Sequence, residues 1–163
     1  FCRRIVWYAI IRIIKPKIVV ETGVDKGLGA LVIAAALEKN DLENNKGRYI
    51  GIDINPEAGY LFEGKYQNYG EIVYGDSLEY LEQYNEKIDL FIHDSNHDPD
   101  FEEREYNVIE NNLSDSTILI SDNAHVSDKL WQFSKQHDFL FLPWEEKPID
   151  HWYPGVITGL CFK

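Results

Sequence analysis

Two apolar runs in the second half of the chain each end in polar side chains with oxygen ligands. The run "IDLFIH" leads into Asp94, and "STILIS" leads into Asp122 and Asn123. Carboxylate and amide oxygens are the hard donors that suit Mg²⁺ or Ca²⁺. If the two runs are neighbouring strands, which lie about 4.8 Å apart, Asp94, Asp122 and Asn123 can converge on one cation.

A glycine-containing turn follows an earlier apolar run. The run "KIVVETG" ends in Glu21 and Gly23, and Gly27 stands where a helix is expected to begin. The two glycines let the backbone turn tightly and approach a ligand closely, and a helix N-terminus favours negative charge. The segment lacks the G-x-G-x-x-G pattern of dinucleotide-binding proteins. It predicts a ligand-binding turn, although a plain strand–helix turn has the same composition.

Acids stand at the ends of the next two apolar runs. Asp53 ends "RYIGID", where its carboxylate can accept hydrogen bonds from the hydroxyls of a ribose. Asp76 and Ser77 follow "EIVYG", where Asp76 can accept a hydrogen bond from an adenine amino group. Asp76 and Glu79 also fit a capping box, so Asp76 has a structural alternative.

These residues need elements that bring the ends of the apolar runs to one edge. We expect strands over 17–23, 48–54, 71–76, 87–93, 116–121, 139–144 and 155–162, and helices over 2–14, 26–40, 77–84, 98–112 and 127–137. The pair Asn55-Pro56 predicts one more helix start. Strand–helix alternation indicates an α/β fold with a mostly parallel sheet, covered on both faces. Ligands bind such open sheets beyond the carboxyl ends of the strands.

The last two predicted strands have only a loop between them, so they are expected to be antiparallel. We therefore predict a single domain over residues 1–163 with a doubly wound, seven-stranded sheet and an antiparallel C-terminal strand. Residues 1–16 are expected to form an N-terminal cover helix, which either covers the cofactor side of the sheet or joins the interface of a homo-oligomer.

Taken in order, the strand ends resemble those of the class I S-adenosylmethionine-dependent methyltransferases. Glu-x-Gly-x-x-x-Gly follows the first strand, an acid the second and Gly-Asp-Ser the third, and the resemblance covers nearly the whole chain. In that family the glycine turn holds the methionine part of the cofactor, the second acid holds the ribose and the third contacts adenine. The resemblance implies a Rossmann-like fold and cofactor binding by Glu21, Gly23, Gly27, Asp53, Ile54, Asp76 and Ser77.

The segment after the fourth strand is similar to that of the divalent-metal-dependent O-methyltransferases, closest to the small-molecule and sugar branch. That branch has Asp-x-Asp-His after strand four, and the family has Asp-Asp or Asp-Asn after strand five. The resemblance implies methyl transfer to a hydroxylated small molecule, with a Mg²⁺ or similar divalent cation held by Asp94, Asp122 and Asn123.

The chain departs from that branch at Asn96, which stands where a second Asp is frequent. An amide cannot take a proton, so the role of base passes to His97, with His125 as the second choice. A neutral imidazole suffices for a hydroxyl that a metal has already acidified. Asp94 and His97 are therefore the predicted catalytic residues.

Acids on the following helix are given structural roles. Asp98 and Asp100 are expected to cap the helix and complement its dipole. Glu102, Glu103 and Glu105 are expected to form its solvated face.

Charge and hydropathy exclude some partners. The net charge is −12, and residues 1–17 contain five basic residues and no acid, so the remainder carries −17. Such a surface repels phosphate backbones, which argues against a nucleic-acid partner. The apolar run Ile5–Ile14 is too short to span a bilayer, and no cleavage site follows it. We expect no membrane partner and a cytoplasmic protein.

Three other functions stay open. The first is a metal-independent N- or O-methyltransferase of the same fold, which the Asp94, Asp122 and Asn123 set disfavours. The second is a non-catalytic cofactor-binding module, which Asn96 keeps open. The third is a nicotinamide-dependent enzyme, which the missing glycine pattern and the late position of Asp53 disfavour.

Overall fold

The computed structural model describes residues 2–163, without the side chains of Cys2 and Arg3. The helices are α1 (Cys2–Ile14), α2 (Leu28–Asp41), α3 (Ser77–Glu82), α4 (Pro99–Ile109) and α5 (Lys129–Gln136), with two 3₁₀ turns, η1 (Gly64–Tyr69) and η2 (Glu110–Asn112). The strands are β1 (Ile18–Thr22), β2 (Arg48–Asp53), β3 (Gly70–Tyr74), β4 (Ile88–His93), β5 (Leu113–Ser121), β6 (Leu140–Glu145) and β7 (Ile157–Phe162).

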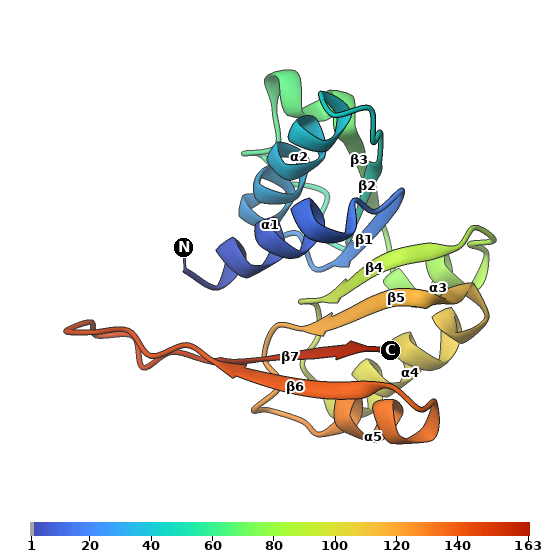
Figure 1. Cartoon of the computed structure of the whole chain (residues 1–163), viewed down its shortest axis with the longest axis vertical. Helices are drawn as coiled ribbons and strands as arrows, with labels where there is room; N and C mark the ends of the chain where they lie inside the picture. Colours follow the sequence, from blue (N-terminus) through green and yellow to red (C-terminus); the bar gives the residue numbers. More distant parts are fainter. Residues whose placement is uncertain (1) are drawn as a thin grey trace.

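The strands form one sheet in the order β3-β2-β1-β4-β5-β7-β6 (Figure 1). The pairs β3–β2, β2–β1, β1–β4 and β4–β5 are parallel, and β7 is antiparallel to both β5 and β6. The prediction of a mostly parallel, seven-stranded α/β sheet with an antiparallel C-terminal strand is confirmed. The strands that precede Asp94 and Asp122, β4 and β5, are neighbours, so the condition for a shared site at their ends is met.

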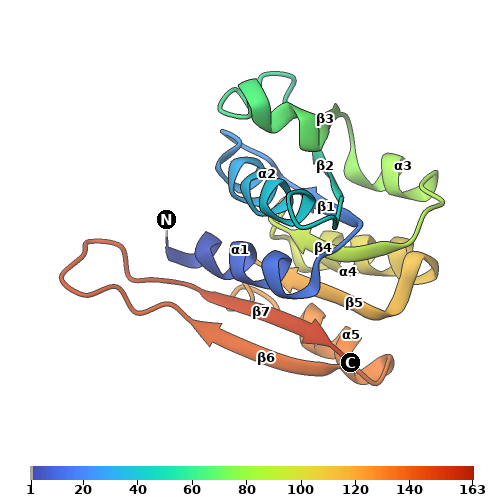
Figure 2. The same ribbon diagram turned by 45° about the horizontal axis from the view of Figure 1, so that its top comes forward.

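The helices cover the two faces of the sheet in separate layers (Figure 2). On one face, Trp7 of α1 and Ile33 of α2 pack in a core cluster with Leu90 and Ile92 of β4. On the other face, Phe91 belongs to a second cluster together with buried residues of α3, α4 and α5: Leu81, Tyr106, Ile109, Leu130 and Phe133. Successive residues of a strand point to opposite faces, so one strand supplies both cores. The same alternation continues into the polar residues at the strand ends.

The helix predicted at Asn55-Pro56 is wrong, because residues 55–63 form turns and η1 follows. The Asn55 side chain accepts a hydrogen bond from the Glu57 N–H at 3.0 Å, as in an Asx turn. Gly59 and Gly64 then take φ angles of 77° and 65°. Left-handed residues at this spacing do not permit a continuous α-helix.

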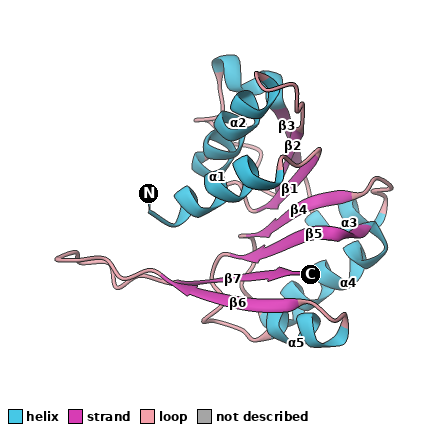
Figure 3. Cartoon of the chain, viewed as in Figure 1, coloured by secondary structure: helices cyan, strands magenta, loops and turns pink. Residues whose placement is uncertain are grey.

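The β6–β7 hairpin has a long connecting loop that extends away from the sheet (Figure 3). Trp152 at this loop is 89% exposed. At the base of the hairpin, the Ala124 N–H donates to the Ile157 carbonyl at 2.8 Å. This bond joins the hairpin to the segment that follows β5.

None of the helices in residues 2–163 is long and apolar enough to span a membrane.

Candidate active site

A cavity of about 420 Å³ opens at the carboxyl ends of the parallel strands. Its lining includes six of the predicted site residues: Gly23, Asp53, Ile54, Asp76, Ser77 and Asp94. Sequence reasoning missed other lining residues, namely Asp25, Asn55, Gly75, Ser95 and Phe101. The first four flank predicted residues, so their closeness to the strand ends was the signal that could have found them, whereas Phe101 lies in α4. The cavity lies where open parallel sheets bind ligands.

The turn after β1 depends on glycine at two positions. Gly23 has φ 84°, and a Cβ added there would lie 2.1 Å from the Asp94 carbonyl oxygen. Gly27 has φ 91° and directly precedes α2. A Cβ on Gly27 would lie 3.0 Å from the Gly59 Cα. The Gly23 position therefore serves the close approach of the β4 end, which brings Asp94 to the cavity.

Asp53 fixes the glycine turn from the end of β2. Its Oδ2 accepts the backbone N–H groups of Val24 and Asp25 at 2.8 and 2.9 Å. Its Oδ1 accepts the Asn55 N–H at 2.8 Å. A carboxylate has about four acceptor positions, so acceptor capacity remains after these three hydrogen bonds. The ribose role of Asp53 stays a prediction.

Asp76 acts as the N-cap of α3, as its structural alternative predicted. Its Oδ1 accepts the Leu78 N–H at 2.8 Å and the Glu79 N–H at 3.4 Å.

Ile54 is 76% exposed at the cavity. It offers an apolar surface for a planar group, and the adenine contacts of Ile54 and Asp76 stay predictions.

Three acids follow or end neighbouring strands on the face that α1 covers. Thr22 pairs with His93, and His93 pairs with Ser121, so Asp94 and Asp122 occupy matching positions. Their N–H groups continue the ladder, to the Thr22 carbonyl at 2.9 Å and the His93 carbonyl at 3.0 Å. Asp122 is fully buried.

Glu21 is the third acid of this face and lies away from the cavity lining. It is buried, and Tyr49 donates a hydrogen bond to it. Burial raises the pKa of Glu21 to about 8, and the nearby charges of Asp122 and Asp53 act in the same direction. The Tyr49 hydrogen bond and the charge of Arg4 lower this pKa but do not outweigh burial. Glu21 is therefore a buried acid in this structure, and its cofactor role stays a prediction.

Arg4 of α1 brings positive charge to these acids. One of its terminal nitrogens lies 3.4 Å from Asp94 Oδ2. Its guanidinium also lies 5.3 Å from the centre of the Trp7 ring. The basic N-terminal helix thus contacts the predicted catalytic acid directly.

The predicted base, His97, lies beside Asn123. The Asn123 side-chain nitrogen is 2.7 Å from His97 Nε2. His125 is tied elsewhere, since its Nδ1 accepts the Ile157 N–H at 3.4 Å. His97 is thus next to a predicted metal ligand, but neither residue is in the cavity lining.

Within the part of the chain that the structure describes, no group of three or more His, Cys, Asp or Glu side chains is arranged as a metal site. The predicted set contains only two such residues, Asp94 and Asp122, because its third member is the amide of Asn123. The metal site stays a prediction.

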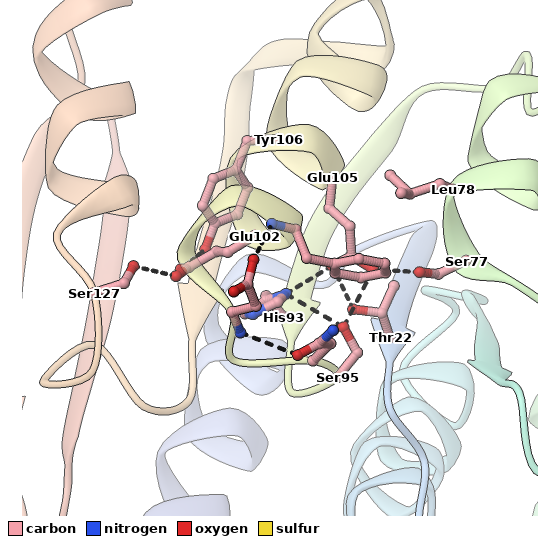
Figure 4. A network of polar contacts seen from close by, with 12 residues as sticks. Thr22, Ser77, Leu78, His93, Ser95, Glu102, Glu105, Tyr106 and Ser127 are labelled. Carbon is pink, nitrogen blue, oxygen red and sulfur yellow. Dashed lines mark hydrogen bonds and ion pairs between the residues drawn. The ribbon is translucent and has the colours of Figure 1, made fainter.

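The expectation of a solvated acidic face on α4 is wrong for two of its three acids. Glu102 and Glu105 are buried. Glu102 accepts hydrogen bonds from the Tyr106 hydroxyl at 2.6 Å and from Ser127, and Glu105 contacts the ends of β1 and β4 (Figure 4). Glu103 faces solvent and pairs with Lys129 at 2.8 Å. Asp98 caps α4 as predicted, accepting from the N–H groups of Asp100 and Phe101.

Comparisons with known proteins agree with the fold. A family described as "methyltransferase domain" matches residues 20–124, which is more than half of the chain. No curated protein matches the sequence.

Solved structures with the same fold include several methyltransferases. The O-methyltransferase TomG from Streptomyces achromogenes, in complex with SAM, superposes with a TM-score of 0.76 at 14% identity, covering 98% of this chain and 78% of its own. An O-methyltransferase from Bacillus cereus in complex with SAH gives a TM-score of 0.74 at 15% identity, covering 99% and 81%. A methyltransferase from Geobacter sulfurreducens gives 0.72 at 20% identity, covering 99% and 79%. The chain therefore belongs to the methyltransferase-domain family and has the fold of the class I S-adenosylmethionine-dependent methyltransferases.

Proposed function

We propose that this enzyme transfers the methyl group of S-adenosylmethionine to a hydroxyl group of a small molecule. One observation carries the proposal: segments far apart in the sequence line one cavity with residues suited to hold the cofactor, and Asp94 lines the same cavity. The structural neighbours described as O-methyltransferases in complex with SAM or SAH support the cofactor and the acceptor atom.

The cofactor is proposed to lie across the carboxyl ends of β1, β2 and β3. Asp53 accepts hydrogen bonds from the ribose hydroxyls, and Ile54 packs against the adenine. Asp76 accepts from the adenine amino group with the oxygen that does not cap α3. In this orientation the methyl group is proposed to face Asp94 and Asn96, which line the same cavity. Alignment of the acceptor oxygen, the methyl carbon and the sulfur is the main requirement of methyl transfer.

A divalent cation is proposed to bind Asp94, Asp122 and Asn123. The donor types fit a hard cation such as Mg²⁺, and Asp94 and Asp122 lie at matching positions of adjacent strands. When bound, such a cation lowers the pKa of an acceptor hydroxyl and orients its oxygen. Arg4, which lies 3.4 Å from Asp94, moves aside to make room for it.

His97 is proposed to accept the hydroxyl proton. In this structure the Asn123 amide nitrogen is 2.7 Å from His97 Nε2. In this role the Nε2 nitrogen would face the acceptor hydroxyl in place of the Asn123 amide. Asn96 lines the cavity and cannot take a proton.

Metal-independent methyl transfer is a second candidate function, and the position of Arg4 favours it. The guanidinium already gives Asp94 a cationic partner. An acceptor oriented by Asp94 and Arg4 would need no divalent ion.

A Mg²⁺ titration by calorimetry separates the two candidates. The proposal predicts a Mg²⁺ binding signal in the wild type that disappears in Asp94→Ala, and methyl transfer that stops on chelation. A matched control is Asp25→Ala, which changes an exposed acid of the cavity lining that is outside the proposed metal set. Methyl transfer that survives chelation, with no Mg²⁺ signal, supports the metal-independent candidate instead.

A further inference from the structure

A buried carboxylate on α4 connects three of the segments that surround the cavity. Glu105 is fully buried, and four side chains contact its two oxygens. Oε2 accepts from the Thr22 hydroxyl at 2.8 Å and lies 2.7 Å from His93 Nδ1. Oε1 accepts from the Ser95 hydroxyl at 3.2 Å and from the Ser77 hydroxyl. Figure 4 shows these side chains gathered at Glu105.

The four contacts come from separate parts of the fold. Thr22 ends β1, His93 ends β4, Ser95 lies in the loop after β4, and Ser77 begins α3. Ser77 and Ser95 line the cavity themselves. Thr22 and His93 directly precede two further lining residues, Gly23 and Asp94. Every contact of Glu105 is therefore part of the cavity wall or adjacent to it.

The backbone alone already fixes the strand register at this edge. Gly23 N–H donates to the Ile52 carbonyl at 2.8 Å, and Asp94 N–H donates to the Thr22 carbonyl at 2.9 Å. The segments not held by this ladder are the loop at Ser95 and the start of α3, and Glu105 reaches both. Burying a carboxylate costs folding free energy unless hydrogen-bond donors compensate it. Apolar residues of similar volume often give equal or greater stability. The arrangement is better suited to fixing geometry than to adding stability.

We infer that Glu105 is a positioning residue, which sets the cavity wall for the cofactor without touching it. The inference rests on the proposed function, because it concerns binding of the proposed cofactor. The Ser77 and Ser95 hydroxyls point to Glu105, and this fixes the rotamers and backbone on either side of the cofactor site. In a Glu105→Gln variant the side chain has one acceptor oxygen and an NH₂ donor in place of two acceptors, so the contacts at one of the two positions must reverse direction or be lost.

The test measures the affinity for S-adenosylhomocysteine by calorimetry, beside thermal unfolding of the same samples. Glu105→Gln is expected to weaken binding about tenfold at temperatures where the variant is folded, because Ser77 and Ser95 are then no longer held in the orientation that shapes the cavity wall; tenfold is equivalent to about 1.4 kcal/mol. The matched control is Glu103→Gln, the same change on the same helix at an exposed residue paired with Lys129. It should bind within about twofold of the wild type.

A second variant keeps the inference testable if Glu105→Gln does not fold. Thr22→Val removes one hydroxyl donor at nearly constant volume, and Thr22 does not line the cavity. We expect folded Thr22→Val to bind S-adenosylhomocysteine about threefold more weakly, equivalent to about 0.7 kcal/mol. Such a loss would support the role of the Glu105 contacts in shaping the cavity.

The outcomes are distinct. A folded Glu105→Gln that binds like the wild type overturns the inference, and so does unchanged binding by Thr22→Val when Glu105→Gln does not fold. A wild-type protein that does not bind S-adenosylhomocysteine overturns the proposed function itself, and the inference with it.

Discussion

At the carboxyl ends of the parallel strands, the two faces of the sheet carry different sets of polar side chains. On the α1 face, the acids Glu21, Asp94 and Asp122 gather, and Arg4 is the cationic side chain that the structure describes beside Asp94. On the α4 face, one acid, Glu105, receives contacts from four side chains. Alternation along β1 and β4 produces both faces, because Glu21 and Thr22 point to opposite sides, as do His93 and Asp94.

The difference is consistent with separate roles for the two faces. A carboxylate surrounded by donors has its acceptor positions occupied, so it holds its neighbours in place. A group of acids on adjacent strands is suited to attract a cation. We therefore propose that residues of the α1 face take part in methyl transfer, and that residues of the α4 face position the cavity wall.

The largest expected effect comes from Gly23→Val, which disrupts the close approach of the turn after β1 to the end of β4. A Cβ at this position would lie 2.1 Å from the Asp94 carbonyl oxygen, and φ is 84°. A β-branched residue there is strained by both the backbone and the clash, and we expect a loss of about 4 kcal/mol or more in the free energy of unfolding. Urea unfolding measures it.

The control for that change is Gly64→Ala. Gly64 has φ 65° and nothing within 4 Å of an added Cβ. Only the backbone cost of about 1 to 2 kcal/mol applies there. Equal losses at the two positions would contradict the role of Gly23 in the approach of β4 to the turn.

The next effect is a dependence of stability on pH that comes from Glu21 on the α1 face. Its pKa in the folded protein is raised to about 8 from 4.5. Below pH 4.5 the group is protonated in both states. As the pH rises from 4.5 to 8, the unfolded chain releases the proton while the folded protein retains it, so stability falls by about 1.4 kcal/mol per pH unit at most.

Glu21→Gln should lack this fall. Between pH 5 and 8 we expect the variant to gain about 3 kcal/mol over the wild type. Denaturant unfolding at a series of pH values measures the gain, with the exposed Glu63→Gln as control. Parallel pH profiles for wild type and Glu21→Gln would count against the raised pKa.

A smaller effect tests whether Arg4 competes with a cation on the α1 face. Removing the guanidinium in Arg4→Gln leaves Asp94 without this partner, so Mg²⁺ affinity should rise about fivefold, equivalent to about 1 kcal/mol. Calorimetry measures the affinity. Arg12→Gln is the control, because Arg12 lies on the same helix but pairs with Glu43. Weaker Mg²⁺ binding in Arg4→Gln would mean that Arg4 supports the site and does not compete for it.

The smallest effect concerns the helix that carries Glu105. Asp98 caps α4 with two hydrogen bonds, whereas Asp128, the N-cap of α5, makes no side-chain cap bond. Asp98→Ala should cost about 1 kcal/mol in unfolding free energy, and Asp128→Ala should cost less than half of that. The comparison uses urea unfolding, and a reversed order would be inconsistent with these caps.

Much of the framework was predictable from local patterns. Apolar runs separated by helical segments predicted the strands, and the acids after two of these runs indicated that Asp94 and Asp122 could converge if the strands were neighbours, as β4 and β5 are. The helix at Asn55-Pro56 failed because Gly59 and Gly64 take left-handed conformations that favourable cap residues cannot overcome.

The burial of Glu105 was not predicted because its partners are distant in sequence. Thr22 is 83 positions away and Ser77 is 28. A local signal did exist: Tyr106 and Ile109 share a helix face with Glu102 and Glu105, at the i, i+3, i+4, i+7 spacing of a buried stripe. This spacing favours burial of Glu102 and Glu105 among hydrogen-bond donors. Their charge alone had led to the prediction that they face solvent.

The most direct test of the account is a calorimetric titration of the wild-type protein with S-adenosylmethionine. The proposed function predicts one binding site per chain with a dissociation constant in the micromolar range, equivalent to about −8 kcal/mol, and binding that Mg²⁺ does not abolish. Absence of binding, with the protein shown to be folded, would contradict the assignment of the cavity to this cofactor.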